Sequence, residues 1–276
     1  ATEEYIRAMQ EAGVNRASIG VQSFDADIQK AINRIQPYKM TAQITQWLRK
    51  HGIDHINMDL MYGLPQHTAE MLAHEAELTI GLKPARVALF GYAHVPWMKS
   101  HMKLINEDDL PGADERWRQF ETASNKFIEA GYVPVGLDHF SMPDDEMTEA
   151  LEEGVLHRNF QGYTADSAPA MIGFGASAIG QLSQGYIQNI SSLKQYRESI
   201  AAGKLPLERG IELSDDDRLR AHVIGRIMCD LGVDLDEACE KFNVSKATFV
   251  PEMEKMTPLS EDGLVTLQDN SITVTE

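Results

Sequence analysis

Short apolar runs alternate with amphipathic stretches through the first half of the chain. Residues 16–22 (RASIGVQ), 56–62 (INMDLMY) and 86–92 (RVALFGY) have the length and composition of strands. Apolar positions three and four apart predict helices over residues 41–51 and 68–80, between these strands. Strands that alternate with helices in this way predict three βα units and a parallel sheet.

The pattern changes in the second half. Residues 114–130 predict a helix, and residues 132–140 predict one further strand. Residues 154–190 are rich in Gly, Asn, Gln and aromatic side chains with little periodicity, which predicts a long functional loop region. Ser214 precedes three acidic residues, a strong helix start. Two more short helices and a hairpin around Asp269 and Asn270 then predict a winged-helix-like end.

These patterns divide the chain into three parts. We expect a partial barrel over residues 1–140, a loop region with a linker helix over residues 141–205, and a helical domain over residues 206–276. Three parallel strands alone leave two exposed edges and an uncovered apolar face. The chain also begins in a predicted helix with no strand before it. We therefore expect a missing N-terminal half, with a partner chain as the alternative.

Composition narrows the class of protein. Apolar residues make up 43% of the 276 positions and charged residues 24%, the balance of a globular protein. The net charge of −17 disfavours nucleic-acid binding, because phosphates require clustered Lys and Arg. No apolar run is long enough to span a membrane, and the N-terminus does not resemble a signal peptide, so we expect a cytoplasmic protein. Cys229 and Cys239 match neither a disulfide framework nor a metal spacing.

Polar side chains end two successive predicted strands. Gln22 closes the first strand, and Asp59 lies within the apolar run of the second. Because ligand sites of parallel barrels lie at the carboxyl ends of the strands, this pair predicts a binding site there. Alternatively, Asp59 caps a nearby loop. Arg34 could serve the same site or be an ordinary exposed helix residue, and His94 alone carries little weight.

Residues 156–164 (LHRNFQGYT) form the densest polar and aromatic cluster of the chain. Arg158 is suited to a carboxylate ligand, because its guanidinium offers two parallel donors. Residues 138–140 (DHF) form a second, smaller cluster. Both clusters could instead line a domain interface.

Five motifs, in this order and spacing, carry a resemblance to a known family. They are GVQSF (20–24), NMDLMYGLP (57–65), YAH (92–94), DHF (138–140) and HRNFQGYT (157–164). Together they resemble the oxygen-independent coproporphyrinogen III oxidases, which are radical S-adenosylmethionine (SAM) enzymes. The first two motifs are shared with sister radical SAM proteins, whereas HRNFQGYT singles out the oxidases.

The resemblance implies an α/β fold, the C-terminal half of a partial (βα)6 radical SAM barrel followed by a mostly helical domain. In the family a [4Fe–4S] cluster is held by the cysteines of a CxxxCxxC motif, which this sequence lacks. The chain would then be a piece without the cluster-binding part, cut at both ends and inactive alone, with no metal ligands of its own.

The implied reaction is oxidative decarboxylation of two propionates of coproporphyrinogen III to vinyl groups, giving protoporphyrinogen IX. A SAM-derived radical starts it, and an electron donor such as flavodoxin or ferredoxin supports it. By motif, Gln22, Arg34, Asp59 and Ala93 match contacts to a second SAM, and Ile179 matches a contact to the cleaved SAM, with Met61 and Phe90 nearby. Candidate propionate-binding residues are His157, Arg158, Asn159, Gln161 and His139.

Two other interpretations stay open. A haem chaperone of the same superfamily would share the first two motifs and bind haem without converting its precursor. An independent interaction module with a winged-helix-like end belongs to a different class, and the acidic charge disfavours DNA as its partner.

Overall fold

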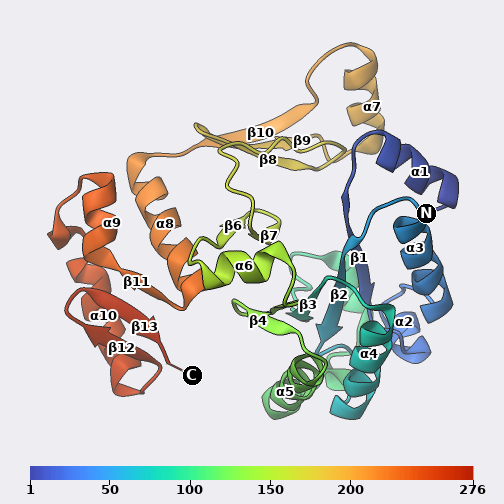
Figure 1. Cartoon of the computed structure of the whole chain (residues 1–276), viewed down its shortest axis with the longest axis horizontal. Coiled ribbons are helices and arrows are strands. Elements are labelled where there is room, and N and C mark those ends of the chain that lie inside the picture. The colour runs from blue at the N-terminus through green and yellow to red at the C-terminus, as the bar shows by residue number, and fades with distance from the viewer. Residues whose placement is uncertain (276) are drawn as a thin grey trace. The chain divides into compact units, whose positions relative to one another are not determined.

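The computed structural model describes residues 1–275, and the chain forms two compact units, Ala1–Glu149 and Ala150–Glu276 (Figure 1). The division into three parts expected from the sequence stays a prediction. Within the described residues, no helix is both long enough and apolar enough to cross a membrane.

The first unit is built on a five-stranded sheet in the order β1-β2-β3-β5-β4. Its first three strands are parallel neighbours, which confirms the three βα units. The strands are β1 (Arg16–Gln22), β2 (His55–Tyr62), β3 (Arg86–Gly91), β4 (Val133–Val135) and β5 (His139–Ser141).

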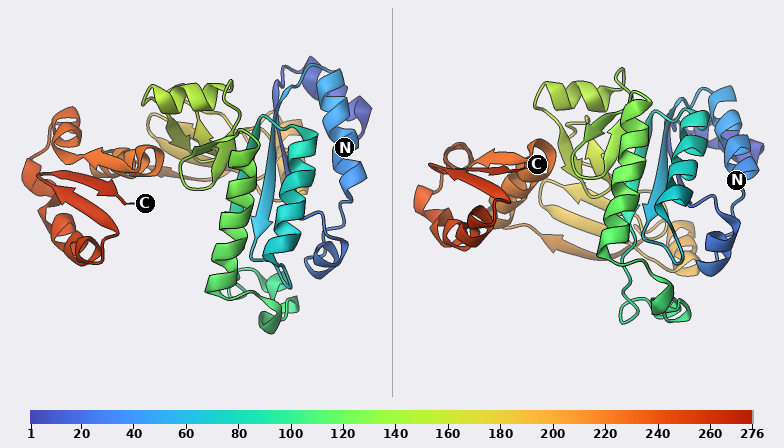
Figure 2. Two further views of the ribbon diagram at one scale, coloured as in Figure 1. Left: turned by 60° about the horizontal axis from the view of Figure 1, so that its bottom comes forward. Right: turned by 90° about the horizontal axis from the view of Figure 1, so that it is seen from below.

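Helices connect these strands, and several begin at a side-chain cap. Asp25 accepts hydrogen bonds from the amides of Asp27 and Ile28 at the start of α2, and Thr68 accepts one from the Met71 amide at the start of α4. Figure 2 shows α4 and α5 running side by side along the sheet. The helices are α1 (Glu3–Glu11), α2 (Ala26–Ala31), α3 (Tyr38–Lys50), α4 (Ala69–Leu82), α5 (Ala113–Glu129) and α6 (Glu146–Glu152), with short 3-10 turns at Ser100–Leu104 and Glu107–Asp109.

Strict alternation along β2 separates the two faces of this sheet. Ile56, Met58 and Leu60 are fully buried and pack with residues of α3, α4 and α5 in one apolar core. Burial of such a side chain contributes about 1.5–3 kcal/mol, so the strand is held firmly in one register. Asn57 and Asp59 consequently point to the other face, which carries the candidate site.

The single strand expected over residues 132–140 is wrong. The segment folds back as a hairpin of β4 and β5, and β5 pairs antiparallel with β3. Gly136 has a φ of 60°, a left-handed conformation that glycine adopts without a steric penalty. The alternating apolar pattern continues on both sides of this turn, which is why the sequence read as one strand.

The second unit begins with two small antiparallel sheets. A hairpin of β6 and β7 precedes a three-stranded sheet in the order β10-β9-β8. The expectation of a long loop over residues 154–190 is wrong where four short strands form, because strands of three to five residues are too short to show a periodicity of two. Residues 165–178 contain no helix or strand. The elements are β6 (His157–Asn159), β7 (Gly162–Thr164), β8 (Ile179–Leu182), β9 (Gly185–Asn189), α7 (Leu193–Ala201) and β10 (Leu207–Glu212).

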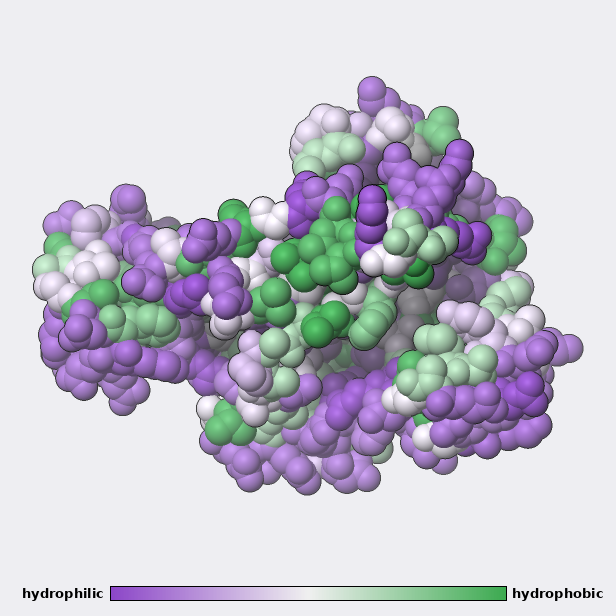
Figure 3. Space-filling model, turned by 90° about the horizontal axis from the view of Figure 1, so that it is seen from above, coloured by the Kyte–Doolittle hydropathy of each residue, from purple (hydrophilic) through white to green (hydrophobic). Residues whose placement is uncertain are grey.

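The remaining residues form the expected winged-helix-like arrangement of helices and a hairpin. Ser214 caps α8, and a tight turn at Asp269, with a φ of 54°, joins the last two strands. Leu219, Val233 and Phe249 lie in the shared core. Hydrophilic residues cover most of the visible surface of this part, at the left of Figure 3. The elements are α8 (Asp215–Asp230), β11 (Gly232–Asp234), α9 (Leu235–Phe242), a 3-10 turn (Lys246–Phe249), α10 (Val250–Glu261), β12 (Val265–Gln268) and β13 (Ser271–Val274).

Candidate functional site

The face of the first sheet that points away from the helices carries polar residues in register. Gly20, Asp59, Ala88 and His139 are successive neighbours across β1, β2, β3 and β5. A second row lies two residues back along the strands. It consists of Ser18, Asn57, Arg86 and Ser141. Neighbouring residues of adjacent strands point to the same side of a sheet, so these rows form one polar surface.

Three of the residues expected to bind SAM converge over Gly20. A Cβ atom placed on Gly20 would lie 2.9 Å from Gln22 Nε2, 3.2 Å from Arg34 Nη2 and 3.9 Å from Asp59 Oδ2. Gly20 therefore leaves the space that the three side chains occupy. The structure brings together residues from β1, β2 and the segment after α2, as the sequence hypothesis required.

Asp59 is held by short polar neighbours. Its carboxylate accepts hydrogen bonds from Asn57 Nδ2 at 2.6 Å and from Ser18 Oγ at 3.3 Å. Burial nevertheless raises the pKa of Asp59 above its ordinary value, although these hydrogen bonds and the charges of His139 and Arg34 act in the opposite direction. A partly desolvated carboxylate of this kind is poised to accept hydrogen bonds from a ligand.

Gln22 and Arg34 are fixed at the end of β1. Gln22 adopts a φ of 68°, and the register with β2 shifts between Gly20 and Gln22. Its side-chain Oε1 is buried and has no hydrogen-bond partner among the described residues, so it is an acceptor that a ligand can satisfy. Arg34 Nη2 donates to the Gly20 carbonyl at 2.6 Å, which holds the guanidinium over the strand.

The other expected residues of the first unit lie on β2, β3 and β5 or directly after β3. Met61 faces Phe90 in the register of β2 and β3, and the Phe90 ring lies 5.8 Å from that of His139. His139, expected to bind a propionate, thus lies beside Phe90, while its Nδ1 is 2.7 Å from Asp138 Oδ1. Ala93 is exposed in the segment after β3.

The second unit brings together three of the expected propionate-binding residues. His157, Arg158 and Asn159 line a pocket of about 230 Å³ with residues 166–171. The Arg158 guanidinium lies 5.0 Å from the centre of the Tyr163 ring, which orients it by a cation–π contact. Gln161 is exposed in the hairpin turn and is not among the residues lining this pocket. Ile179 begins β8 and pairs with Gln188.

The polar surface fits SAM as a ligand. SAM carries an ammonium group, ribose hydroxyls and an adenine amino group, which the acceptors Gln22 Oε1 and Asp59 can bind, and a carboxylate, which suits Arg34. An iron–sulfur cluster does not fit. Its family ligands are three cysteines, whereas Cys229 and Cys239 are the two present and both are buried. Among the described residues, no cluster of three or more His, Cys, Asp or Glu side chains could hold a metal.

Ser18, Asn57 and Gly20 were missed by sequence reasoning. Asn57 lies two residues before Asp59, so the period of two along β2 could have placed both on one face. Ser18 and Gly20 occupy the matching positions of β1, but their importance depends on the register between the strands. A local sequence pattern does not contain that register.

Comparison with known proteins places this geometry in a class. Residues 1–79 match the radical SAM superfamily, and residues 213–276 match the HemN C-terminal domain. A solved structure of coproporphyrinogen III oxidase (HemN) from Escherichia coli, described as a radical SAM enzyme, superposes with a TM-score of 0.89 at 34% identity. It matches 100% of this chain, which covers 64% of that one. The fold class is thereby confirmed: part of a radical SAM barrel followed by a mostly helical region.

Two curated relatives are oxygen-independent coproporphyrinogen III oxidases. The oxygen-independent coproporphyrinogen III oxidase of Bradyrhizobium diazoefficiens is 46% identical over 273 residues, 99% of this chain and 61% of the relative. That of Helicobacter pylori J99 is 40% identical over 275 residues, 99% of this chain and 60% of the relative. Over 99% of its length the chain is therefore similar to oxygen-independent coproporphyrinogen III oxidases. It spans about three-fifths of the length of these relatives.

Proposed function

We propose that this chain provides SAM-binding and substrate-binding parts of an oxygen-independent coproporphyrinogen III oxidase. The reaction converts two propionate side chains of coproporphyrinogen III to vinyl groups and yields protoporphyrinogen IX. The convergence of Gln22, Arg34 and Asp59 over Gly20 is the single observation that supports this proposal most. It unites side chains from three separate segments around one small residue, on the side of the sheet away from the core.

Bound SAM would supply the oxidising radical that this chemistry needs. The residues of this chain bind SAM and hold it in one orientation. Asp59, with its raised pKa, and the buried Gln22 Oε1 accept hydrogen bonds from the ligand, while Arg34 offers a donor to its carboxylate. Because these groups lie on strands and a tightly bonded loop, little conformational freedom is lost when the ligand binds.

Substrate recognition is assigned to the hairpin of β6 and β7. Coproporphyrinogen III carries four propionates, and Arg158 can hold a carboxylate with two parallel N–H donors. The stacking of Arg158 on Tyr163 limits its rotamers, which lowers the entropy lost on binding. His157 and Asn159 extend the pocket with further hydrogen-bonding groups. Ala93, Ile179, Met61, Phe90, His139 and Gln161 are proposed as additional contacts.

Two experiments test the proposal. Isothermal titration of the 276-residue chain with SAM and with coproporphyrin III should give saturable binding of each, and Arg158→Lys should weaken porphyrin binding about tenfold while SAM binding is kept.

A chimera in which this chain replaces the matching 273 residues of the Bradyrhizobium diazoefficiens relative should form protoporphyrinogen IX from coproporphyrinogen III and SAM without oxygen. A folded chimera that binds haem and forms no vinyl product would instead favour the haem chaperone.

The chain alone should show no turnover in this assay, because its residues do not fit the cluster. The electron donor, expected to be a flavodoxin or a ferredoxin, and the cytoplasmic location stay predictions.

A further inference from the structure

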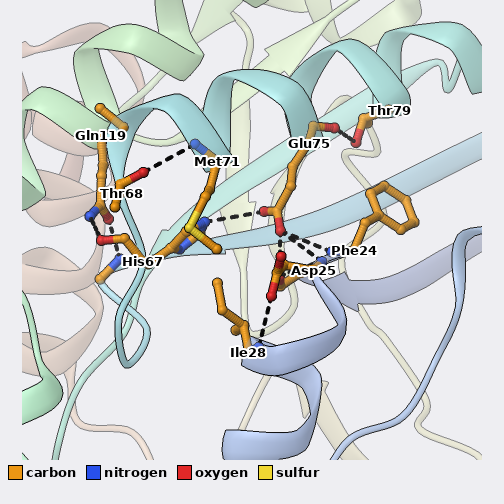
Figure 4. A network of polar contacts seen from close by, with 12 residues as sticks. Phe24, Asp25, Ile28, His67, Thr68, Met71, Glu75, Thr79 and Gln119 are labelled. Atoms are coloured by element: carbon orange, nitrogen blue, oxygen red, sulfur yellow. Dashed lines mark hydrogen bonds and ion pairs between the residues drawn. The ribbon is translucent and has the colours of Figure 1, made fainter.

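Glu75 is a buried carboxylate in the middle of α4, with 2% of its surface exposed. Its Oε1 accepts hydrogen bonds from Ser23 Oγ, from the Phe24 amide at 3.0 Å and from the Asp25 amide at 3.2 Å (Figure 4). The three donors are consecutive residues of the loop that joins β1 to α2. One side chain of α4 therefore accepts hydrogen bonds from three consecutive residues of that turn.

A carboxylate at this position costs stability unless donors surround it. An apolar residue would fill the same core position of α4 without that cost, but it would leave the Ser23 hydroxyl and the Phe24 amide without their acceptor. The hydrogen bonds of the loop therefore explain the charged residue at this position, and the packing of the helix does not.

The loop that Glu75 holds directly follows Gln22. Gln22 has a φ of 68°, and a non-glycine residue keeps a left-handed conformation only where its surroundings enforce it. The bonds from Glu75 to residues 23–25 fix the chain immediately after this strained position. They thereby fix the direction of the Gln22 side chain over Gly20.

Arg34 is connected to the same loop through Gln29, which is also buried. Gln29 Nε2 donates to the Ser23 carbonyl at 2.9 Å, and the Arg34 amide donates to the Gln29 carbonyl at 2.8 Å. Arg34 Nη2 then reaches the Gly20 carbonyl. Hydrogen bonds through Ser23 and Gln29 therefore connect Glu75 to Arg34, whereas Gln22 is joined to this loop by the backbone.

His67 joins the next loop to this carboxylate. Its side chain is completely buried, and its Nε2 lies 3.4 Å from Glu75 Oε2, a contact that is an ion pair only when His67 is protonated, since no hydrogen bond joins the two atoms. His67 belongs to the segment between β2 and α4, which Gln119 of α5 holds by accepting from the Gly63 amide at 2.8 Å and donating to the His67 carbonyl at 2.6 Å. The pair thus links the loops that leave two adjacent parallel strands.

We propose that Glu75, together with His67, is a positioning pair that sets the orientation of Gln22 and Arg34 for the ligand. The inference rests on the proposed function in so far as that ligand is SAM. Neither residue is assigned a contact with the ligand itself. Glu75 acts through the loop between β1 and α2, and His67 acts through its contact with Glu75.

The test compares three variants of the 276-residue chain. Glu75→Leu removes the acceptor, and Glu75→Gln keeps an oxygen that can accept from residues 23–25. Thr79→Val is the matched control: Thr79 is buried one turn further along α4, and its hydroxyl bonds only to the Glu75 carbonyl in the structure. Hydrogen–deuterium exchange of residues 20–36 measures how firmly the loop is held in the absence of any ligand. Titration with SAM measures the affinity of the site.

In Glu75→Leu we expect exchange in residues 20–36 to accelerate about tenfold or more and SAM affinity to fall about tenfold. Glu75→Gln and Thr79→Val should keep both near the wild-type values, whatever their melting temperatures. Unchanged exchange in Glu75→Leu overturns the positioning role, and so does an equal loss of affinity in Thr79→Val at the same loss of stability. Faster exchange with unchanged SAM affinity would show that Glu75 holds the loop but does not set the orientation of Gln22 and Arg34 for the ligand. If the wild-type chain binds no SAM, the assigned ligand is wrong, and the exchange data alone decide the role of Glu75.

Discussion

At the scale of single residues, Asp59 is a carboxylate in a position that costs the fold stability. Asp59 lies between the buried residues Met58 and Leu60, and its carboxylate is partly removed from water. Asn57 and Ser18 donate hydrogen bonds to it, but burial still raises its pKa. A group under this kind of strain is characteristic of a binding site, because a structural role alone would favour a neutral side chain.

We predict that Asp59→Asn stabilises the fold while it weakens SAM binding. The folded state holds the proton of Asp59 more tightly than the unfolded state does, so the wild type loses stability as the pH rises from the ordinary value of 3.8 through the raised pKa. The neutral variant avoids this loss. Its free energy of unfolding should exceed that of the wild type at pH 7 and match it near pH 3, and its SAM affinity should fall about tenfold.

Urea denaturation at the two pH values and titration with SAM measure these effects. Asp54→Asn, at an exposed position just before β2, controls for the change in net charge and should alter neither quantity. A loss of stability in Asp59→Asn at pH 7 would contradict the prediction.

The pKa of Glu146 is lowered, in contrast to that of Asp59. Hydrogen bonds from Arg16 and then Arg86 lower its pKa from the ordinary value of 4.5 to about 2. A lowered pKa adds stability above the ordinary value, and that stability is lost as the pH falls from about 4.5 through about 2. Since 37% of the Glu146 side chain is exposed, solvent screens the pair, and Glu146→Gln should cost only about 1 kcal/mol at pH 7.

The cost of Glu146→Gln should shrink to nothing near pH 2, as measured by urea denaturation across this pH range. Glu149→Gln, at an exposed neighbouring position of α6, serves as the control. A cost that does not change with pH would mean that Glu146 acts through packing instead of charge.

At the scale of elements, long strands and helices could be predicted from the sequence, whereas short strands could not. The strand at Arg16–Gln22 was predicted with its observed bounds, because seven residues show an alternation and a glycine ends the preceding helix. The hairpin at residues 133–141 was not predicted, since its turn interrupts no apolar pattern. Glu75 was missed for a related reason: its burial depends on which face of α4 meets the β1 loop, and that contact spans 50 residues of sequence.

Helix α8 offers a test of local structure in the second unit. The amide and hydroxyl of Ser214 donate to Asp217 Oδ2 at 2.9 and 2.7 Å, and the Asp217 amide donates back to Ser214 Oγ at 3.1 Å. Ser214→Ala should therefore cost about 1 kcal/mol and accelerate exchange in the first turn of the helix. Ser167→Ala, in an exposed loop, should change neither. Equal protection of that turn in both variants would show that the acidic first turn suffices.

At the scale of the whole molecule, the polar surface that we propose binds SAM and the two cysteines of the chain belong to different units. The polar surface is assembled from β1, β2 and their loops, all within the first unit. The two cysteines lie in α8 and α9 of the second unit. Burial raises the pKa of both thiols, which disfavours the thiolate form that iron requires. The chain should therefore bind SAM without iron.

We predict that anaerobic treatment of the 276-residue chain with ferrous iron and sulfide produces no [4Fe–4S] spectrum, because two buried thiols cannot replace three exposed thiolates. Visible absorption and electron paramagnetic resonance after removal of excess iron measure the outcome, and SAM affinity should be equal before and after treatment. The variant Cys229→Ser/Cys239→Ser should behave in the same way. A cluster signal that disappears in this double variant would contradict the prediction and assign the cysteines a ligand role. A SAM affinity that rises only when iron is bound would show that the polar surface of β1 and β2 depends on the metal.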